Sequence, residues 1–323
     1  MEKKRIFICS TGRTATQFFA KYLNKMIDCS VSIHEPGTPW LNKGKLLLEQ
    51  LHHYGFYHLT FGQGLNTHSM YKLSRDYVAK EISNEKACEN IKRINNVVDN
   101  LYVQEVIVYS SGHIYGLLGL LDEVYEDSRF IFIIRDPRDW ISSALNKTLY
   151  TLYGPLEYFY HHISLQPSCI KDDPYIEQWS KMSKFEKYCW FYNKLNQICI
   201  NDMQDRENFK IYKYEDLFIS KDKAHNFESM LNFATDFKSG KVACDFKSEM
   251  IDNKIDSKQK KEVSWHDWTS EQVLIMEKHC GNIMRTFGYG EEDVWRKKIQ
   301  SKSTQSDSKL TKVQNPIATR FNA

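Results

Sequence analysis

The sequence predicts an α/β protein in which a parallel β-sheet is flanked by helices. Short, continuous apolar runs, typical of buried parallel strands, alternate with longer segments whose apolar residues recur at helical spacing. Such alternation is typical of chains that place helices against the faces of a parallel sheet. We expect one domain over residues 1–299 and a polar, disordered tail over residues 300–323.

The first unit is a strand, a turn and a helix. Residues 5–9 form an apolar run that ends at the turn residues 10–12, and residues 17–27 carry aromatic and aliphatic side chains at helical spacing. Residues 30–33 predict a second short strand. The segment 40–100 is expected to be mostly helical or irregular.

A second unit repeats this order further along the chain. Residues 106–109 predict a strand, residues 114–125 a helix, and residues 129–134 another buried strand. Pro137 is well placed to open the following helix, 138–145, because proline is tolerated in the first helical turn.

The remaining elements complete the sheet and its helical cover. Residues 179–200 carry one apolar stripe and predict a long amphipathic helix, and residues 209–214 predict a further strand. The polar, lysine-rich segment 236–262 is expected to be a long loop. Residues 269–286 predict a last helix, with Gly288 after its end.

Composition excludes several classes of protein. The 44 Lys and Arg against 41 Asp and Glu give a net charge of +3, which argues against a dedicated nucleic-acid binder. No segment reaches the ~18–20 apolar residues of a membrane helix, and the N-terminus lacks a signal-peptide pattern. The 8 cysteines are scattered without a Cys-x-x-Cys pair, so we expect free thiols and a cytoplasmic location. The oligomeric state is left open.

The turn after the first predicted strand has the chemistry of an anion site. Gly12 allows a close backbone approach, Arg13 adds a permanent charge, and the hydroxyls of Thr14 and Thr16 can donate to phosphate or sulfate oxygens. The segment lacks the second glycine and the lysine of the nucleotide-triphosphatase loop. The alternative is an ordinary strand-to-helix turn with a capping threonine.

A second basic element follows another predicted strand. Arg135 comes directly after residues 129–134, and Ser143 lies eight residues further on, in the next predicted helix. An arginine fork and a serine hydroxyl can converge on one phosphate. Ligands of open α/β sheets bind at the carboxyl ends of strands, where we expect residues 10–16 and Arg135 to meet.

Taken together, these motifs resemble those of the sulfotransferases that use 3′-phosphoadenosine 5′-phosphosulfate (PAPS). Residues 12–17 (GRTATQ) resemble the 5′-phosphosulfate loop, and residues 135–143 (RDPRDWISS) the 3′-phosphate motif. Residues 214–217 (YEDL) and the ending Trp265…Phe287-Gly-Tyr289 are similar to later landmarks, the ending to that of carbohydrate sulfotransferases. One departure is Ala15, where the family's loop usually has glycine.

This resemblance implies a P-loop-like fold and transfer of the sulfuryl group of PAPS to an acceptor hydroxyl, with 3′-phosphoadenosine 5′-phosphate (PAP) as product and no metal. The resemblance to the carbohydrate branch, together with the absence of a membrane anchor, favours a saccharide or small-metabolite acceptor, with no nucleic acid as partner. The residues that the resemblance assigns to the donor are Gly12, Arg13, Thr14, Ala15, Thr16, Gln17, Arg135 and Ser143, with Arg13 also stabilising charge during transfer.

An acceptor hydroxyl needs a general base within hydrogen-bond reach. Glu35, in an Ile-His-Glu-Pro segment, resembles the acidic residue of the carbohydrate branch, and His34 stands one position earlier. His113 precedes Arg135 by an offset similar to that of the catalytic histidine of the cytosolic branch. We rank Glu35 first, His34 second and His113 third. Each histidine also has a structural alternative: His34 could orient Glu35, and His113 could cap a helix.

Several other residues have a structural interpretation beside a functional one. Arg138 has two interpretations, a contact with the nucleotide and a solvent-facing side chain near Asp136 and Asp139, of which we favour the second. Trp140 is expected to pack in the core rather than to stack on adenine. One lysine of 258–261 is a candidate nucleotide contact, and the stretches 40–75 and 147–179 are candidate acceptor-binding insertions. The histidines at 52, 53, 58 and 68 lack the spacing of a helical metal-ligand pair, so no metal is expected.

Two other functions remain open. One is a kinase-like phosphotransferase of the same broad fold, against which the missing loop lysine counts. The other is a non-catalytic relative that binds PAP or a sulfated ligand.

Overall fold

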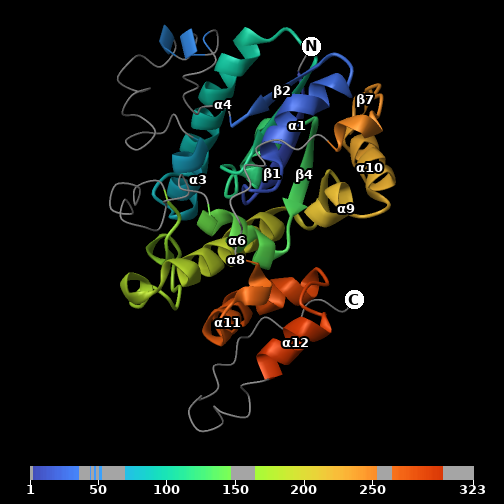
Figure 1. Ribbon diagram of the computed structural model, residues 1–323. Helices are drawn as coiled ribbons and strands as arrows, with labels where there is room; N and C mark the ends of the chain where they lie inside the picture. Colours follow the sequence, from blue (N-terminus) through green and yellow to red (C-terminus); the bar gives the residue numbers. More distant parts are fainter. Residues whose placement is uncertain are drawn as a thin grey trace.

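A computed structural model describes residues 3–35, 44, 47–48, 51–52, 70–146, 164–252 and 264–300. Its centre is a five-stranded parallel sheet with the order β2-β3-β1-β4-β5 (Figure 1). The predicted fold class and all five predicted strands are confirmed. The strands are β1 (Lys4–Ser10), β2 (Ser30–His34), β3 (Val106–Ser111), β4 (Ser128–Ile134) and β5 (Phe209–Lys213).

Helices cover the sheet and extend beyond its carboxyl edge (Figure 1). Among them α11 packs on α8, and α8 packs on α6. The α-helices of the described residues are α1 (Thr16–Tyr22), α3 (Met70–Val78), α4 (Asn84–Leu101), α5 (Leu118–Val124), α6 (Pro137–Asn146), α8 (Lys184–Met203), α9 (Tyr214–Phe218), α10 (Lys223–Thr235), α11 (Ser270–Thr286) and α12 (Asp293–Gln300).

Alternate side chains of each central strand enter two different hydrophobic cores. On β1, Ile6 and Ile8 pack with side chains of α1 and α10, whereas Phe7 and Cys9 pack with those of α4, α5 and α8. All four are buried, because successive strand residues point to opposite faces and both faces are covered. This explains why the strand has a continuous apolar run in the sequence.

Several predicted helices have different bounds. The predicted helix 17–27 is α1 followed by a 3₁₀ turn, Leu23–Lys25, and the predicted helix 114–125 begins only at Leu118. The predicted helix 179–200 begins at Lys184, because Ser183 caps it by accepting from the Glu186 amide at 3.1 Å. The predicted helix 269–286 agrees closely with α11, whose Thr269 and Gln272 form a capping box.

The segment predicted as a long loop contains local structure. Strands β6 (Asp236–Phe237) and β7 (Gly240–Lys241) form a short antiparallel hairpin. The backbone of Cys244 pairs with that of Ile27 in an isolated antiparallel β-bridge. The prediction for 236–252 is therefore wrong in part, while residues 253–263, including the lysines at 258–261, lie outside the described residues. The helices α9, α10 and α12 were not predicted. The predicted tail, after Gln300, also lies outside the described residues.

No described helix is long and apolar enough to cross a lipid bilayer. All 8 cysteines are free thiols, five of them buried.

Arg138 corrects the expectation of a solvent-facing side chain. It is 1% exposed, and its guanidinium bonds both carboxylate oxygens of Asp136 and both of Glu292. The guanidinium carbon also lies 4.4 Å from the ring centroid of Trp265 and 5.1 Å from that of Trp295. A buried cation between two aromatic faces joins the C-terminal helices to α6.

We expect Arg138→Ala to lower the free energy of unfolding by about 3–5 kcal/mol, because it leaves the buried carboxylate of Asp136 without its partner. Urea denaturation measures this change. Arg296→Ala is the matched control, since Arg296 and Glu291 form an ion pair whose two side chains are 53% and 54% exposed. That change costs about 1 kcal/mol or less. Equal losses in both variants would contradict the role given to Arg138.

Candidate functional site

The loop between β1 and α1 has an unusual backbone. Gly12, Arg13 and Ala15 have left-handed φ angles of 75°, 54° and 65°. Ala15 is also the N-cap residue of α1 and makes no side-chain capping bond, so the interpretation of this loop as a turn with a capping threonine is wrong. An alanine in this conformation costs about 1–2 kcal/mol relative to the right-handed region. The loop therefore holds a conformation that glycine adopts without strain.

The loop after β3 packs directly against the loop after β1. A Cβ atom placed on Gly112 would lie 3.0 Å from the Gly12 nitrogen and 3.2 Å from the Gly12 Cα. Only glycine fits at position 112 without a shift of backbone, because the nearest atoms belong to the main chain. This close approach places His113 beside the first loop.

Three contacts from the segment after β4 hold the first loop in place. The Trp140 indole Nε1 donates to the Gly12 carbonyl at 2.8 Å, and Arg135 Nη1 donates to the Arg13 carbonyl at 2.9 Å. The Arg13 side chain donates from Nε and Nη2 to the Ser143 hydroxyl at 3.1 and 3.0 Å. The structure thus brings together Arg13, Arg135 and Ser143, as the order of the motifs predicts.

Two polar atoms at this junction are buried without a hydrogen-bond partner among the described residues. They are the Thr14 hydroxyl and Nε of Arg135. Leaving a buried donor unpaired costs about 1–3 kcal/mol, which an anionic ligand would offset by accepting from it. The Arg135 guanidinium carbon lies 4.7 Å from the ring centroid of Tyr214. The residues present therefore fit a phosphate or sulfate group.

The three candidate bases form one acid–imidazole cluster, composed of His34, Glu35 and His113. Glu35 Oε1 lies 3.6 Å from His113 Nε2, and Glu35 Oε2 lies 3.7 Å from His34 Nδ1. The other ring nitrogen of His34 is 3.1 Å from the Thr16 hydroxyl, which links the cluster to α1. The side chains of His113, Glu35 and His34 are 30%, 20% and 11% exposed, so His113 and Glu35 are the more accessible.

The backbone and neighbours of this cluster hold its geometry. Glu35 has a left-handed φ of 48°, and its amide donates to the Ser110 carbonyl at 3.0 Å. The His113 ring stacks on Tyr71 with 4.6 Å between centroids, and its carbonyl accepts from the Ser74 hydroxyl at 2.5 Å. His113 does not cap a helix, since Leu117 is the N-cap residue of α5. The supporting residues of α3 were missed because no motif marks them in the sequence.

Not every predicted residue joins the site. Gln17 is exposed on the first turn of α1, and no hydrogen bond among the described residues joins its side chain to the loop. Trp140 is fully buried against Tyr188 and Tyr192, as the packing interpretation predicts.

The described residues hold no group of three or more His, Cys, Asp or Glu side chains placed for a metal ion. The histidines at 53, 58, 68, 161 and 162, and most of 40–69 and 147–163, lie outside the described residues.

Burial and charge change the pKa values of two groups near Arg135. Burial and the neighbouring charge of Asp136 raise the pKa of Asp139. Burial and the Glu215 carboxylate raise the pKa of Tyr289, so its hydroxyl keeps its proton and remains a donor.

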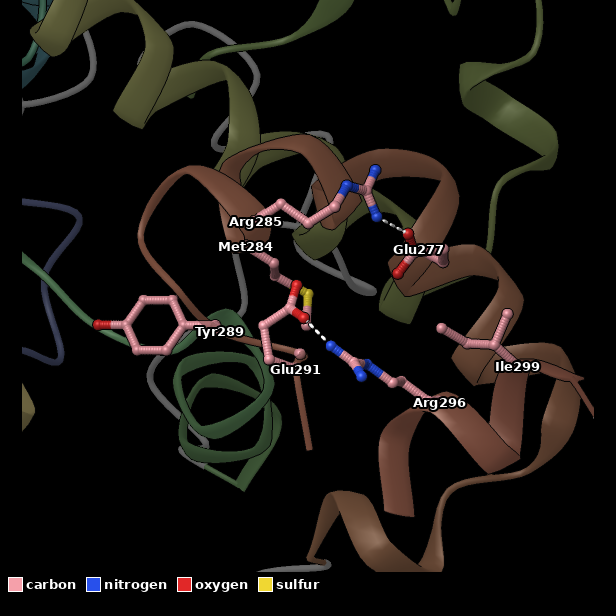
Figure 2. A pocket seen from close by; sticks show the side chains of 8 residues that line it. Glu277, Met284, Arg285, Tyr289, Glu291, Arg296 and Ile299 are labelled. Atoms are coloured by element: carbon pink, nitrogen blue, oxygen red, sulfur yellow. Dashed lines mark hydrogen bonds and ion pairs between the residues drawn. The ribbon is translucent and has the colours of Figure 1, made fainter. Parts of the chain in front are cut away.

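A separate small pocket lies between α11 and α12 (Figure 2). Its four charged side chains form two ion pairs, Arg285 with Glu277 and Arg296 with Glu291, and Tyr289 also lines it. Because each cation there faces its own carboxylate, the pocket lacks the convergence of charge that the loop after β1 has.

No protein-family model matches the chain, and no curated protein sequence matches it. Among solved structures, sulfotransferase STF9 from Mycobacterium avium aligns over 90% of this chain and 78% of its own, with 13% sequence identity and a TM-score of 0.50. The chain has the sulfotransferase fold.

Two further solved structures align with lower scores. A sulfotransferase from Alicyclobacillus acidocaldarius is 11% identical, with 92% of this chain and 100% of that chain covered and a TM-score of 0.44. The sulfotransferase domain of the Synechococcus PCC 7002 olefin synthase is 13% identical, with 90% and 96% covered and a TM-score of 0.43. The alignment with STF9 confirms, at the level of the fold, the family resemblance that the motifs indicate.

Within this sulfotransferase fold, the two basic motifs occupy adjacent positions. They follow β1 and β4, which are neighbouring parallel strands, and both stand at the carboxyl edge of the sheet. Such edges are where ligands of open α/β sheets bind.

We expect Ala15→Gly to raise the free energy of unfolding by about 1 kcal/mol, because it removes an alanine from the left-handed conformation. The greater conformational entropy of glycine in the unfolded chain offsets part of this gain. Ala20→Gly, in the middle of α1, is the matched control and lowers stability by about 1 kcal/mol. Chemical denaturation of both variants checks the opposite signs. A loss of stability in Ala15→Gly would show that the loop does not strain residue 15.

Proposed function

We propose that the protein is a PAPS-dependent sulfotransferase that transfers a sulfuryl group to the hydroxyl of a saccharide or small metabolite, without a metal. The observation that carries the proposal is the junction of Arg13, Arg135 and Ser143 at the carboxyl edge of the sheet. A donor with a phosphosulfate at one end and a 3′-phosphate at the other needs two anion sites, and the two motifs supply them.

The reaction requires one bond to form and one to break. The acceptor oxygen bonds to sulfur while the bond between sulfur and the bridging phosphate oxygen breaks, and its electron pair remains on PAP. The acceptor's proton passes to a base of the protein. Arg13, Thr14 and Thr16 would stabilise the charge that develops on the sulfuryl oxygens and the leaving phosphate, as in phosphoryl transfer.

The acid–imidazole cluster supplies the base in this proposal. Glu35 and His113 face one another and are accessible, so the acceptor's proton can reach either of them. His34 is instead engaged with Thr16 on one nitrogen and faces Glu35 with the other, which suits an orienting role. This keeps Glu35 as the first candidate and moves His113 ahead of His34.

Two other functions are distinguishable by simple binding and turnover measurements. A kinase-like phosphotransferase would be stabilised against heat by ATP with magnesium rather than by PAP. A non-catalytic relative would bind PAP or a sulfated ligand but release no product. The absence of the Walker lysine from the loop favours PAPS over ATP. A screen of alcohols and sugars with radiolabelled PAPS identifies the acceptor.

Arg135→Ala should weaken PAP binding by about 2–4 kcal/mol, because it removes a charged contact to the 3′-phosphate. Isothermal titration calorimetry measures the loss. Adenosine 5′-monophosphate (5′-AMP), which lacks the 3′-phosphate, serves as the control ligand and should lose much less affinity than PAP, because only the loss of the bond from Arg135 to the Arg13 carbonyl affects it. Unchanged PAP affinity would refute the proposed donor site.

Glu35→Gln and His113→Ala should each lower kcat by about 10²–10⁴-fold if the residue takes the proton, and leave PAP affinity within about twofold. The residue with the larger loss is the base, and the other orients it. Single-turnover assays with PAPS measure the rates. His34→Ala is the comparison variant, with a smaller expected loss. Full activity in both Glu35→Gln and His113→Ala would exclude the acid–imidazole cluster from proton transfer.

A further inference from the structure

The peptide group between Arg135 and Asp136 is held at both ends by side chains from distant parts of the chain. The Tyr192 hydroxyl, from α8, donates to the Arg135 carbonyl. On the other side of the same peptide group, the Asp136 amide donates to Glu215 Oε1 at 3.0 Å. Glu215 belongs to the segment 214–217, one of the motifs to which the reaction assigns no role.

Glu215 is itself held from the C-terminal end of the chain. The Tyr289 hydroxyl donates to Glu215 Oε2 at 2.6 Å, so the carboxylate uses one oxygen for the Asp136 amide and the other for Tyr289. Tyr289 lies between Gly288 and Gly290, which have left-handed φ angles of 69° and 78°. This double turn after α11 directs the tyrosine toward α9 and away from the ion pairs of the neighbouring pocket (Figure 2).

Local packing keeps the tyrosine in this position. Its side chain is buried, with a residue exposure of 7%, and Lys213 Nζ lies 5.2 Å from its ring centroid. Burial and the neighbouring Glu215 raise the pKa of Tyr289, so its hydroxyl keeps the proton that it donates to Glu215.

We propose that Glu215 and Tyr289 are positioning residues that aim the Arg135 guanidinium by fixing the peptide group from which its side chain departs. The inference rests on the proposed function, because it deepens the account of the 3′-phosphate site. Arg135 Nη1 bonds the Arg13 carbonyl and Nε is buried without a partner, so a small rotation of its backbone would move both atoms relative to the loop.

The test compares Tyr289→Phe with Tyr125→Phe. Both tyrosines are 7% exposed, and the hydroxyl of each makes a hydrogen bond to a side chain. Tyr125 precedes β4, at the opposite edge of the sheet, where its hydroxyl accepts from Asn95. We expect Tyr289→Phe to weaken PAP binding about five- to tenfold and to change 5′-AMP binding less than twofold. Tyr125→Phe should leave both affinities unchanged. Calorimetry with PAP and with 5′-AMP measures all four effects.

A double-mutant cycle separates positioning from general damage to the fold. In the Arg135→Ala background, Tyr289→Phe should change PAP affinity less than twofold, because the side chain that it aims is absent. Glu215→Gln keeps an oxygen that can accept from the Asp136 amide, so its PAP affinity should lie between those of the native protein and Glu215→Ala. An equal loss of PAP and 5′-AMP affinity, or a loss that persists without Arg135, would overturn the inference.

Amide hydrogen exchange distinguishes failure of this inference from failure of the proposed function. Tyr289→Phe should accelerate exchange at the Asp136 amide at least fivefold, whatever the ligand is, because that amide donates to Glu215. If the native protein binds PAP no better than 5′-AMP, the donor assignment is wrong, and with it the role at a 3′-phosphate. If PAP binds well but Asp136 exchange is unchanged in the variant, the positioning inference alone is wrong.

Discussion

The candidate site depends on the attachment of the first loop to the segment that follows β4. Gly12 and Arg13 each give their carbonyl to a donor from that segment, Trp140 and Arg135, while the Arg13 side chain reaches Ser143. Both loop carbonyls thereby have hydrogen-bond donors. A loop with two left-handed residues that are not glycine is strained, and these bonds compensate for the strain.

The same attachment joins the two basic motifs, although more than a hundred residues separate them in the sequence. β1 and β4 are neighbours in the sheet, with Ser10 in register with Ile133, so the residues after each strand emerge side by side. The C-terminal helices add a second level of support, since Arg138 bonds Glu292 and Asp136 within one buried group. The chain after residue 264 thus stabilises the turn that carries Arg135.

The sequence predicts well what depends on local pattern and fails where distant partners decide. Strand β1 is a continuous apolar run, and its position in the sheet follows from that pattern. Arg138 stands between two aspartates in the sequence, which suggests exposure to solvent. In the structure Trp265, Trp295 and Glu292 bury it, and these distant residues do not enter a local sequence pattern. Tyr71, which stacks on His113, was missed for the same reason. The predicted strand 209–214 is one residue too long. Its alternation of apolar and basic residues continues to Tyr214, which in the structure is the first residue of α9.

The ranking of the three candidate bases illustrates a different limit. Motif spacing treats His34, Glu35 and His113 as competitors, whereas the structure makes them neighbours with different partners. Because His34 bonds Thr16, the cluster is tied to the helix that begins at the anion loop, and the carboxylate of Glu35 lies between two imidazoles. Replacing one member of the cluster removes a contact of its neighbours, so the effects of substitutions at the three positions are not expected to add.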